Sequence, residues 1–103
     1  MHIVLTTTAT IDEAESLASM LVEARLAACV QIVQPVTSIY LWEGKLHNEK
    51  EHLLLIKTLP EKWEQVREFI TTNHSYEVPE IVAIDAENVS EPYLAWIRET
   101  ILP

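Results

Sequence analysis

Imidazole and carboxylate side chains gather in one short stretch of this 103-residue chain, between residues 47 and 52. His47, Glu49 and Glu51 alternate along it, so an extended strand would direct all three to the same side. Imidazole nitrogen and carboxylate oxygen are ligands of zinc and copper, so this spacing predicts a metal site. His52 would face the other way. The same charges also suit an ordinary solvated turn, and the sequence leaves both interpretations open.

A second group of polar side chains stands at the ends of apolar segments. Lys57 ends the most apolar run of the chain, while His74 and Glu80 lie on a long polar connection. We expect these three to converge in one polar cleft. The aromatic residues expected to line that cleft are Tyr76, Tyr93 and Trp96, and Trp42 is a further candidate for its lining. The alternative is that each has a separate structural role, with the amine of Lys57 reaching from the strand end to water.

Signatures of catalysis are missing from the chain. It has one glycine, so it cannot build the usual nucleotide cradles, and it has no Gly-x-Ser-x-Gly or Cys-x-x-Cys motif. The single cysteine, Cys29, lies in an apolar context and is expected to behave as a small hydrophobic residue. One cysteine allows no intramolecular disulfide, which favours a cytoplasmic location. We therefore do not expect an enzyme.

The net charge of −9 limits the partners of the protein. It argues against binding to nucleic acid or to anionic lipid, and it is compatible with cations or simply with solubility. No apolar run approaches the length of about 20 residues that a membrane-spanning helix needs. The first residues lack the basic segment of a secretory signal.

Two strand-like runs flank Gly44 and predict a long β-hairpin over residues 36–58. Its tip is expected near Trp42 and Gly44, with Tyr40 and Trp42 on one face of the first arm. Both arms, at about ten residues, exceed the usual strand length of roughly five to six. Edges of that length invite aggregation unless another copy covers them.

The other elements follow from capping and periodicity. A strand over residues 2–9 precedes a helix that begins at a capping box formed by Thr10 and Glu13. Residues 29–35 predict a strand kinked by Pro35, and 53–56 a central strand covered on both sides. Thr58 is expected to begin a second helix, followed by a strand over 81–84 and a final helix from Ser90.

This order, βαββαβ with a terminal helix, predicts one α+β domain over residues 1–103. Right-handed crossovers make it a ferredoxin-like antiparallel sheet with both main helices on one face. The other face then has little cover of its own, so bare face and overhanging hairpin together predict a homo-oligomer.

Several motifs resemble one known family, the CutA divalent-cation tolerance proteins. They occur in the right order over nearly the whole chain: Leu26-Ala-Ala-Cys-Val30, Thr37-Ser-Ile-Tyr-x-Trp-x-Gly44, Ile56-Lys-Thr58, His74-x-Tyr76, Pro79-Glu-Ile81 and Tyr93-Leu-x-Trp96. The resemblance implies a ferredoxin-like fold assembled as a homotrimer with interlocking hairpins. It also implies a bacterial cytoplasmic protein of divalent metal tolerance, copper binding in some members, and no established reaction.

The sequence departs from the family pattern at Val36, Ser75 and Val89. By resemblance, copper ligands are expected at positions that here hold Thr6, Asn73 or His74, and Glu80. A threonine hydroxyl is a poor ligand for copper, so His74 and Glu80 are the metal candidates. The cofactor expected from these residues is a weakly bound divalent cation, copper or zinc.

Two functions remain open from the sequence. One is a homotrimeric metal-tolerance protein that binds a divalent cation or a small ligand at clefts between subunits. The other is a PII-like trimeric signalling or scaffold module with a protein or small-molecule partner and no metal role. In that case the hairpin around Trp42 would be the contact surface.

Overall fold

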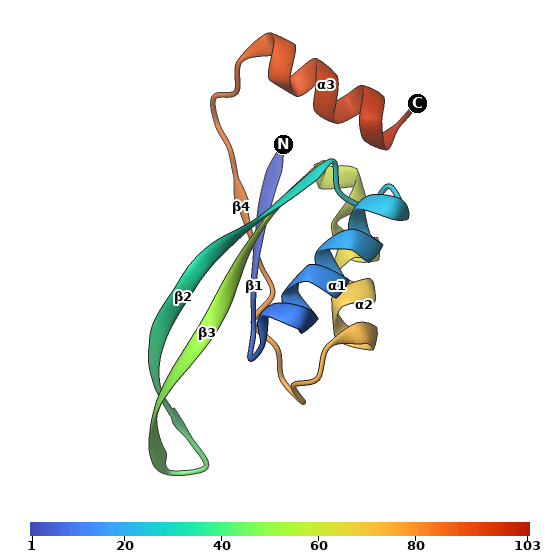
Figure 1. The fold of residues 1–103 in the computed structure, drawn as a ribbon. Helices are drawn as coiled ribbons and strands as arrows, with labels where there is room; N and C mark the ends of the chain where they lie inside the picture. Colours follow the sequence, from blue (N-terminus) through green and yellow to red (C-terminus); the bar gives the residue numbers. More distant parts are fainter.

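The computed structural model describes all 103 residues and contains one four-stranded sheet and three α-helices. The elements are β1 (His2–Thr8), α1 (Ile11–Glu23), β2 (Cys29–Trp42), β3 (Lys45–Thr58), a 3₁₀ turn (Pro60–Lys62), α2 (Trp63–Asn73), β4 (Val82–Asp85) and α3 (Glu91–Ile101). The strand order is β2-β3-β1-β4, and every neighbouring pair is antiparallel. The predicted ferredoxin-like order is confirmed, and α1 and α2 lie on the same face of the sheet (Figure 1).

The main core lies between that face and the two helices. Val4, Leu54 and Ile56 point from the sheet toward Leu17 and Val66, and all five side chains are fully buried. Alternation along each strand places every second residue in this layer. Apolar burial of this kind contributes roughly 25 cal/mol per Å² of area removed from water.

Strand β3 is central, as predicted, but the chain itself covers only one of its faces. Leu54 and Ile56 are buried against the helices, whereas Leu53 and Leu55 on the opposite face are only half-buried. Helix α3 does not cover that face. It packs beyond the end of the sheet, in a separate cluster that contains Ala28, Leu59, Ile97 and Ile101 (Figure 1). The prediction of cover on both sides is therefore wrong for a single chain.

The β2-β3 hairpin extends well beyond the rest of the sheet (Figure 1). Each strand has 14 residues, because the segment after Cys29 continues directly into the first hairpin arm. The register shifts between Val33 and Val36, so the predicted irregularity at Pro35 is confirmed. Glu43 and Gly44 form a two-residue turn with φ of 51° and 78°, the geometry that matches the twist of a hairpin.

Only one of the two predicted helix caps forms. The Thr10 hydroxyl accepts the Glu13 amide at 3.1 Å, which confirms the first half of the capping box. The second half of the box does not form: the Glu13 carboxylate accepts hydrogen bonds from Ser75 and not from the Thr10 amide. Thr58 caps no helix: it is the last residue of β3, and its hydroxyl donates to the Leu26 carbonyl at 2.6 Å.

None of the three helices is both long enough and apolar enough to cross a membrane.

Candidate functional site

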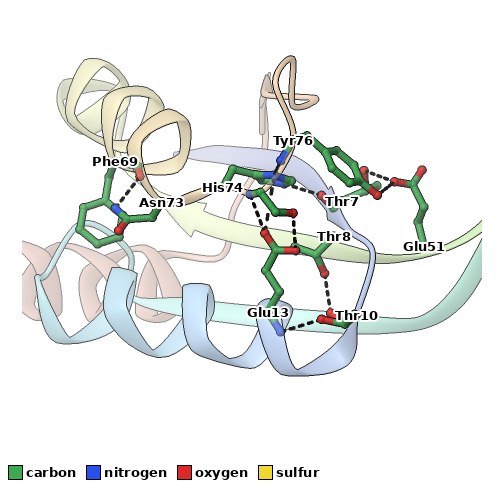
Figure 2. A network of polar contacts seen from close by, with 10 residues as sticks. Thr7, Thr8, Thr10, Glu13, Glu51, Phe69, Asn73, His74 and Tyr76 are labelled. Carbon is green, nitrogen blue, oxygen red and sulfur yellow. Dashed lines mark hydrogen bonds and ion pairs between the residues drawn. The ribbon is translucent and has the colours of Figure 1, made fainter. Parts of the chain in front are cut away.

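A buried carboxylate, that of Glu51, lies where β3 passes the end of β1. It is 6% exposed and accepts hydrogen bonds from the hydroxyls of Thr7 at 3.1 Å and Tyr76 at 2.6 Å (Figure 2). Strand alternation directs Glu51 to the face that α1 and α2 leave uncovered, together with Leu53 and Leu55. A charged acceptor makes hydrogen bonds roughly twice as strong as a neutral one, so this contact fixes the Tyr76 ring.

These hydrogen bonds determine the protonation states of both partners. Burial raises the pKa of Glu51, but hydrogen bonds from Tyr76 and Thr7, with the nearby Ser38 hydroxyl, bring it below the ordinary 4.5. Burial, followed by the hydrogen bond to Glu51, raises the pKa of Tyr76 above its ordinary 10. At neutral pH Glu51 is therefore an anion, and Tyr76 is a neutral donor.

The side chain of His74 is fully buried, and both of its ring nitrogens have hydrogen-bond partners (Figure 2). Its Nε2 lies 2.7 Å from the Thr7 carbonyl oxygen, and its Nδ1 accepts the Tyr76 amide at 3.0 Å. A carbonyl can only accept, so Nε2 carries the proton and the ring is the neutral tautomer. His74 thus connects the end of β1 to the loop after α2.

Glu13 holds the same loop from the other side. Its carboxylate accepts hydrogen bonds from the Ser75 amide and the Ser75 hydroxyl, both at 2.9 Å, and lies 3.7 Å from His74 Nδ1. The first turn of α1 is therefore tied to residues 74–76 (Figure 2). This connection positions Tyr76 above Glu51.

An open groove of about 600 Å³ lies beside this network. Residues from β1, both hairpin strands and the loop before β4 line it: Thr7, Ser38, Ile39, Tyr40, Trp42, Glu51, Tyr76, Glu77, Val78 and Glu80. The structure thus brings together the predicted cleft residues Trp42 and Tyr76, the metal candidate Glu80, and the hairpin residue Tyr40. Gly44 lies beyond them, in the turn.

Three predicted cleft residues lie elsewhere. Lys57 pairs with Ile3 in the sheet, whereas Leu53 pairs with Thr7, so four residues, about 13 Å of strand, separate Lys57 from the groove end of β3. Its amine lies 5.9 Å from the centre of the Tyr93 ring, which stacks on Trp96 at 5.8 Å. The prediction that Lys57 converges with His74 and Glu80 is therefore wrong within one chain, because these residues belong to opposite ends of the sheet.

The hairpin residues of the predicted metal set do not form a cluster. His47 stacks on Tyr40 and lies 3.6 Å from Glu49, but Glu51 bonds to Thr7 and Tyr76 instead. His52 pairs with Thr8 of the neighbouring strand β1. Nowhere in the chain do three histidine, cysteine, aspartate or glutamate side chains come together as a metal site. Cys29 is a half-buried free thiol.

Several groove residues were absent from the sequence prediction, namely Thr7, Ser38, Glu77 and Val78. Thr7 carried a signal, because a threonine in the buried end of a strand must satisfy its hydroxyl. Glu51 also carried a signal, because it lies two residues before Leu53 and four before Leu55 and therefore points to the same face of the strand. Its side chain thus belongs to the sheet and not to the solvated turn. No feature of the sequence marked Ser38 or Glu77 as a groove residue.

The chain matches a known family along nearly its whole length. Residues 2–100 match the family model described as "CutA1 divalent ion tolerance protein". The "Divalent-cation tolerance protein CutA" of Thermus thermophilus is 43% identical over 98 residues, which cover 95% of each chain. Human "Protein CutA" is 41% identical over 86 residues, which cover 84% of this chain and 48% of the human protein. The chain thus spans nearly all of the bacterial relative and about half of the human one.

Solved structures agree with these sequence matches. The "Periplasmic divalent cation tolerance protein CutA" of Archaeoglobus fulgidus superposes with a TM-score of 0.94 at 40% identity, over 98% of this chain and 99% of that one. The Thermus thermophilus protein superposes with a TM-score of 0.92 at 42% identity, over 97% and 98% of the two chains. The resemblance inferred from the motifs is therefore confirmed, and the chain belongs to the CutA1 divalent ion tolerance protein family.

Proposed function

We propose that this protein acts in divalent-cation tolerance, as a homotrimer in the cytoplasm of a bacterium. The observation that supports this most strongly is family membership over residues 2–100, with relatives named for divalent-cation tolerance. The charge of −9 and the carboxylates of the groove suit a protein that meets cations. The single cysteine suits a reducing compartment.

Exposed apolar side chains support the homotrimer. Leu41 and Leu46 face each other across the hairpin and are 71% and 72% exposed, and Ile39 beside them is 64% exposed. Val82 and Ile84 on the uncovered sheet face are about half exposed. Apolar surface spread over both a hairpin and a sheet face is typical of a protein–protein interface. Self-association would remove it from water.

The residues of one chain do not fit a closed copper or zinc centre. His74 would have to break a hydrogen bond to Thr7 or Tyr76 before it could bind a metal, and the Thr6 hydroxyl is a poor ligand. Glu80 is exposed at the groove and is the available donor among the candidates. A copper or zinc ion would therefore be held weakly, with ligands from more than one copy.

Metal titration of the intact protein tests this proposal. Chelator-treated protein is titrated with Cu²⁺ and with Zn²⁺ and followed by native mass spectrometry and thermal unfolding. Saturating metal at about a hundredfold over its dissociation constant should add about 2.7 kcal/mol of stability. Glu80→Gln should weaken binding, while the matched surface variant Glu87→Gln should not. If neither metal binds or shifts unfolding, the metal part of the proposal fails.

The groove favours a second candidate, a PII-like module that binds a small molecule. Its volume of about 600 Å³ lies within the range of small-molecule pockets, and three of its lining residues are aromatic. Such a module would bind its ligand in the presence of a chelator and would need no metal. Binding measured in chelator therefore separates the two functions.

A further inference from the structure

The turn that ends α1 contains a residue in an unfavourable backbone conformation. Arg25 has a φ of 57°, in the left-handed region that residues other than glycine rarely adopt. Its amide donates to the Val22 carbonyl at 3.0 Å, and the next amide, that of Leu26, donates to the Leu21 carbonyl at 3.0 Å. These two bonds form a Schellman motif, in which glycine usually occupies the left-handed position. An arginine there is strained where a glycine would not be.

The side chain of Arg25 makes a contact that a glycine could not make. Its guanidinium donates a 2.7 Å hydrogen bond to the carbonyl of Thr100, which lies 75 residues away in the last turn of α3. The last carbonyls of a helix have no partner within that helix, and the negative end of the helix dipole attracts a cation. Arg25 thus satisfies one of these carbonyls and connects the end of α3 to the end of α1.

Helix α3 has few other connections to the chain. Ile97 and Ile101 are its buried residues, and they pack with Ala28 and Leu59 in a cluster that is separate from the main core. Residues 87–90, which join β4 to α3, belong to no helix or strand. Figure 1 shows α3 apart from α1 and α2, at one end of the molecule. Elements with few buried contacts open at a lower free energy than the core does.

From these observations we infer that α3 opens as a unit about residues 87–90, independently of the main core, and that Arg25 holds it closed. The strained conformation of Arg25 supports a role for its side chain, since such strain persists only where the surrounding structure stabilises it. The bond between Arg25 and Thr100 lies outside the hairpin and the uncovered sheet face, so self-association through those surfaces does not replace it. The inference does not depend on the metal role proposed above.

The closed and open states of α3 differ in the apolar surface at this end of the sheet. Ala28 and Leu59 are buried where α3 packs against them, and opening of the helix would expose both to water. A contact that exists in only one of two states shifts the population toward that state. The bond from Arg25 to Thr100 exists only when α3 is closed, so it favours the closed state.

Amide hydrogen exchange of the intact protein tests the inference, with peptides from α3 compared with peptides from β1. In the wild type, α3 should exchange faster than β1. Arg25→Met removes the donor and keeps the backbone strain, whereas Arg25→Gly removes both. Each variant should speed exchange in α3 by about tenfold, the effect of losing one hydrogen bond from a charged donor. Arg25→Lys keeps a cation near the helix end and should give an intermediate rate.

Exchange in β1 distinguishes this role from a general structural one. It should be slower in Arg25→Gly than in Arg25→Met, because glycine relieves the strain of the left-handed conformation, while α3 exchanges equally fast in both. Arg67→Met is the control, since Arg67 is an exposed arginine of α2 whose ion pairs are with Glu64 and Glu68 of the same helix. It should leave exchange in α3 as in the wild type.

Three results would overturn the inference. One is exchange in wild-type α3 as slow as that in β1, because the helix then opens only when the whole chain unfolds. Another is unchanged exchange of α3 in both Arg25→Met and Arg25→Gly. The last is equal acceleration of α3 and β1 in both variants, which would show that Arg25 supports the fold as a whole. The exchange samples contain no metal, so these outcomes leave the metal proposal untouched.

Discussion

The phenol of Tyr76 donates a 2.6 Å hydrogen bond to the carboxylate of Glu51, 25 residues away in the chain. This bond joins the loop after α2 to the central strand β3 and shapes the groove between them. Around it, His74 and Glu13 fix the loop to β1 and α1. The candidate site is thus a rigid part of the fold.

Tyr76→Phe should destabilise the protein by about 2 kcal/mol, because it removes a donor from a buried charged acceptor. Urea unfolding at one fixed chain concentration measures the change. Tyr93→Phe is the matched control, since the Tyr93 hydroxyl makes no hydrogen bond and its ring stacking on Trp96 is kept. Equal stability of Tyr76→Phe and wild type would show that the bond contributes nothing.

Stability should depend on pH through Glu51. Its pKa is lower in the folded protein than the ordinary 4.5, so its carboxylate stabilises the fold fully above that value. This contribution declines as the pH falls through the lower folded-state pKa. The free energy of unfolding of wild type minus that of Glu51→Gln, measured from pH 7 downward, should therefore decrease below about pH 4.5. The decrease should be smaller in the Tyr76→Phe background, and a flat difference would contradict the assignment.

Glu13→Ala should destabilise the protein by about 1 kcal/mol and speed hydrogen exchange at the Ser75 amide, because that amide donates to Glu13 at 2.9 Å. Glu15→Ala changes a carboxylate in the same helix, at an exposed position, and is the control. If both variants exchange equally at Ser75, Glu13 does not hold the loop.

Gly44→Ala should cost about 1 kcal/mol, entirely from backbone strain. The residue has a φ of 78°, which an L side chain rarely adopts, while nothing lies within 4 Å of an added Cβ. Glu43→Asn is the comparison, since asparagine tolerates the left-handed conformation that Glu43 adopts at a φ of 51°. Thermal unfolding should rank Glu43→Asn at or above wild type and Gly44→Ala below it. The reverse order would exclude the turn geometry.

Local signals predicted much of the fold. Gly44 marked the turn, Pro35 the irregularity in β2, and Thr10 the start of α1, because each acts on residues adjacent in sequence. Thr58 shows where this fails. Its Thr-x-x-Glu spacing is the same as that of Thr10, yet the sheet extends to it and its hydroxyl serves the Leu26 carbonyl. Only the tertiary contact distinguishes the two threonines.

The candidate site was predicted in part for the same reason. Trp42, Tyr76 and Glu80 do meet in one groove, but Lys57 does not, since the register of β3 on β1 decides how far it lies from Thr7. Local spacing does not specify that register. Glu51 was assigned to the turn with His47, although its bonds to Thr7 and Tyr76 cross 44 and 25 residues of sequence. Such long-range pairs are invisible to pattern analysis.

Self-association is the central proposal, because a partner copy would remove the exposed apolar side chains of the hairpin and the uncovered sheet face from water. Native mass spectrometry of the untagged protein at micromolar chain concentration tests it most directly. We predict one dominant species at three times the chain mass of 11.8 kDa. A folded single chain as the dominant species at that concentration would contradict the claim.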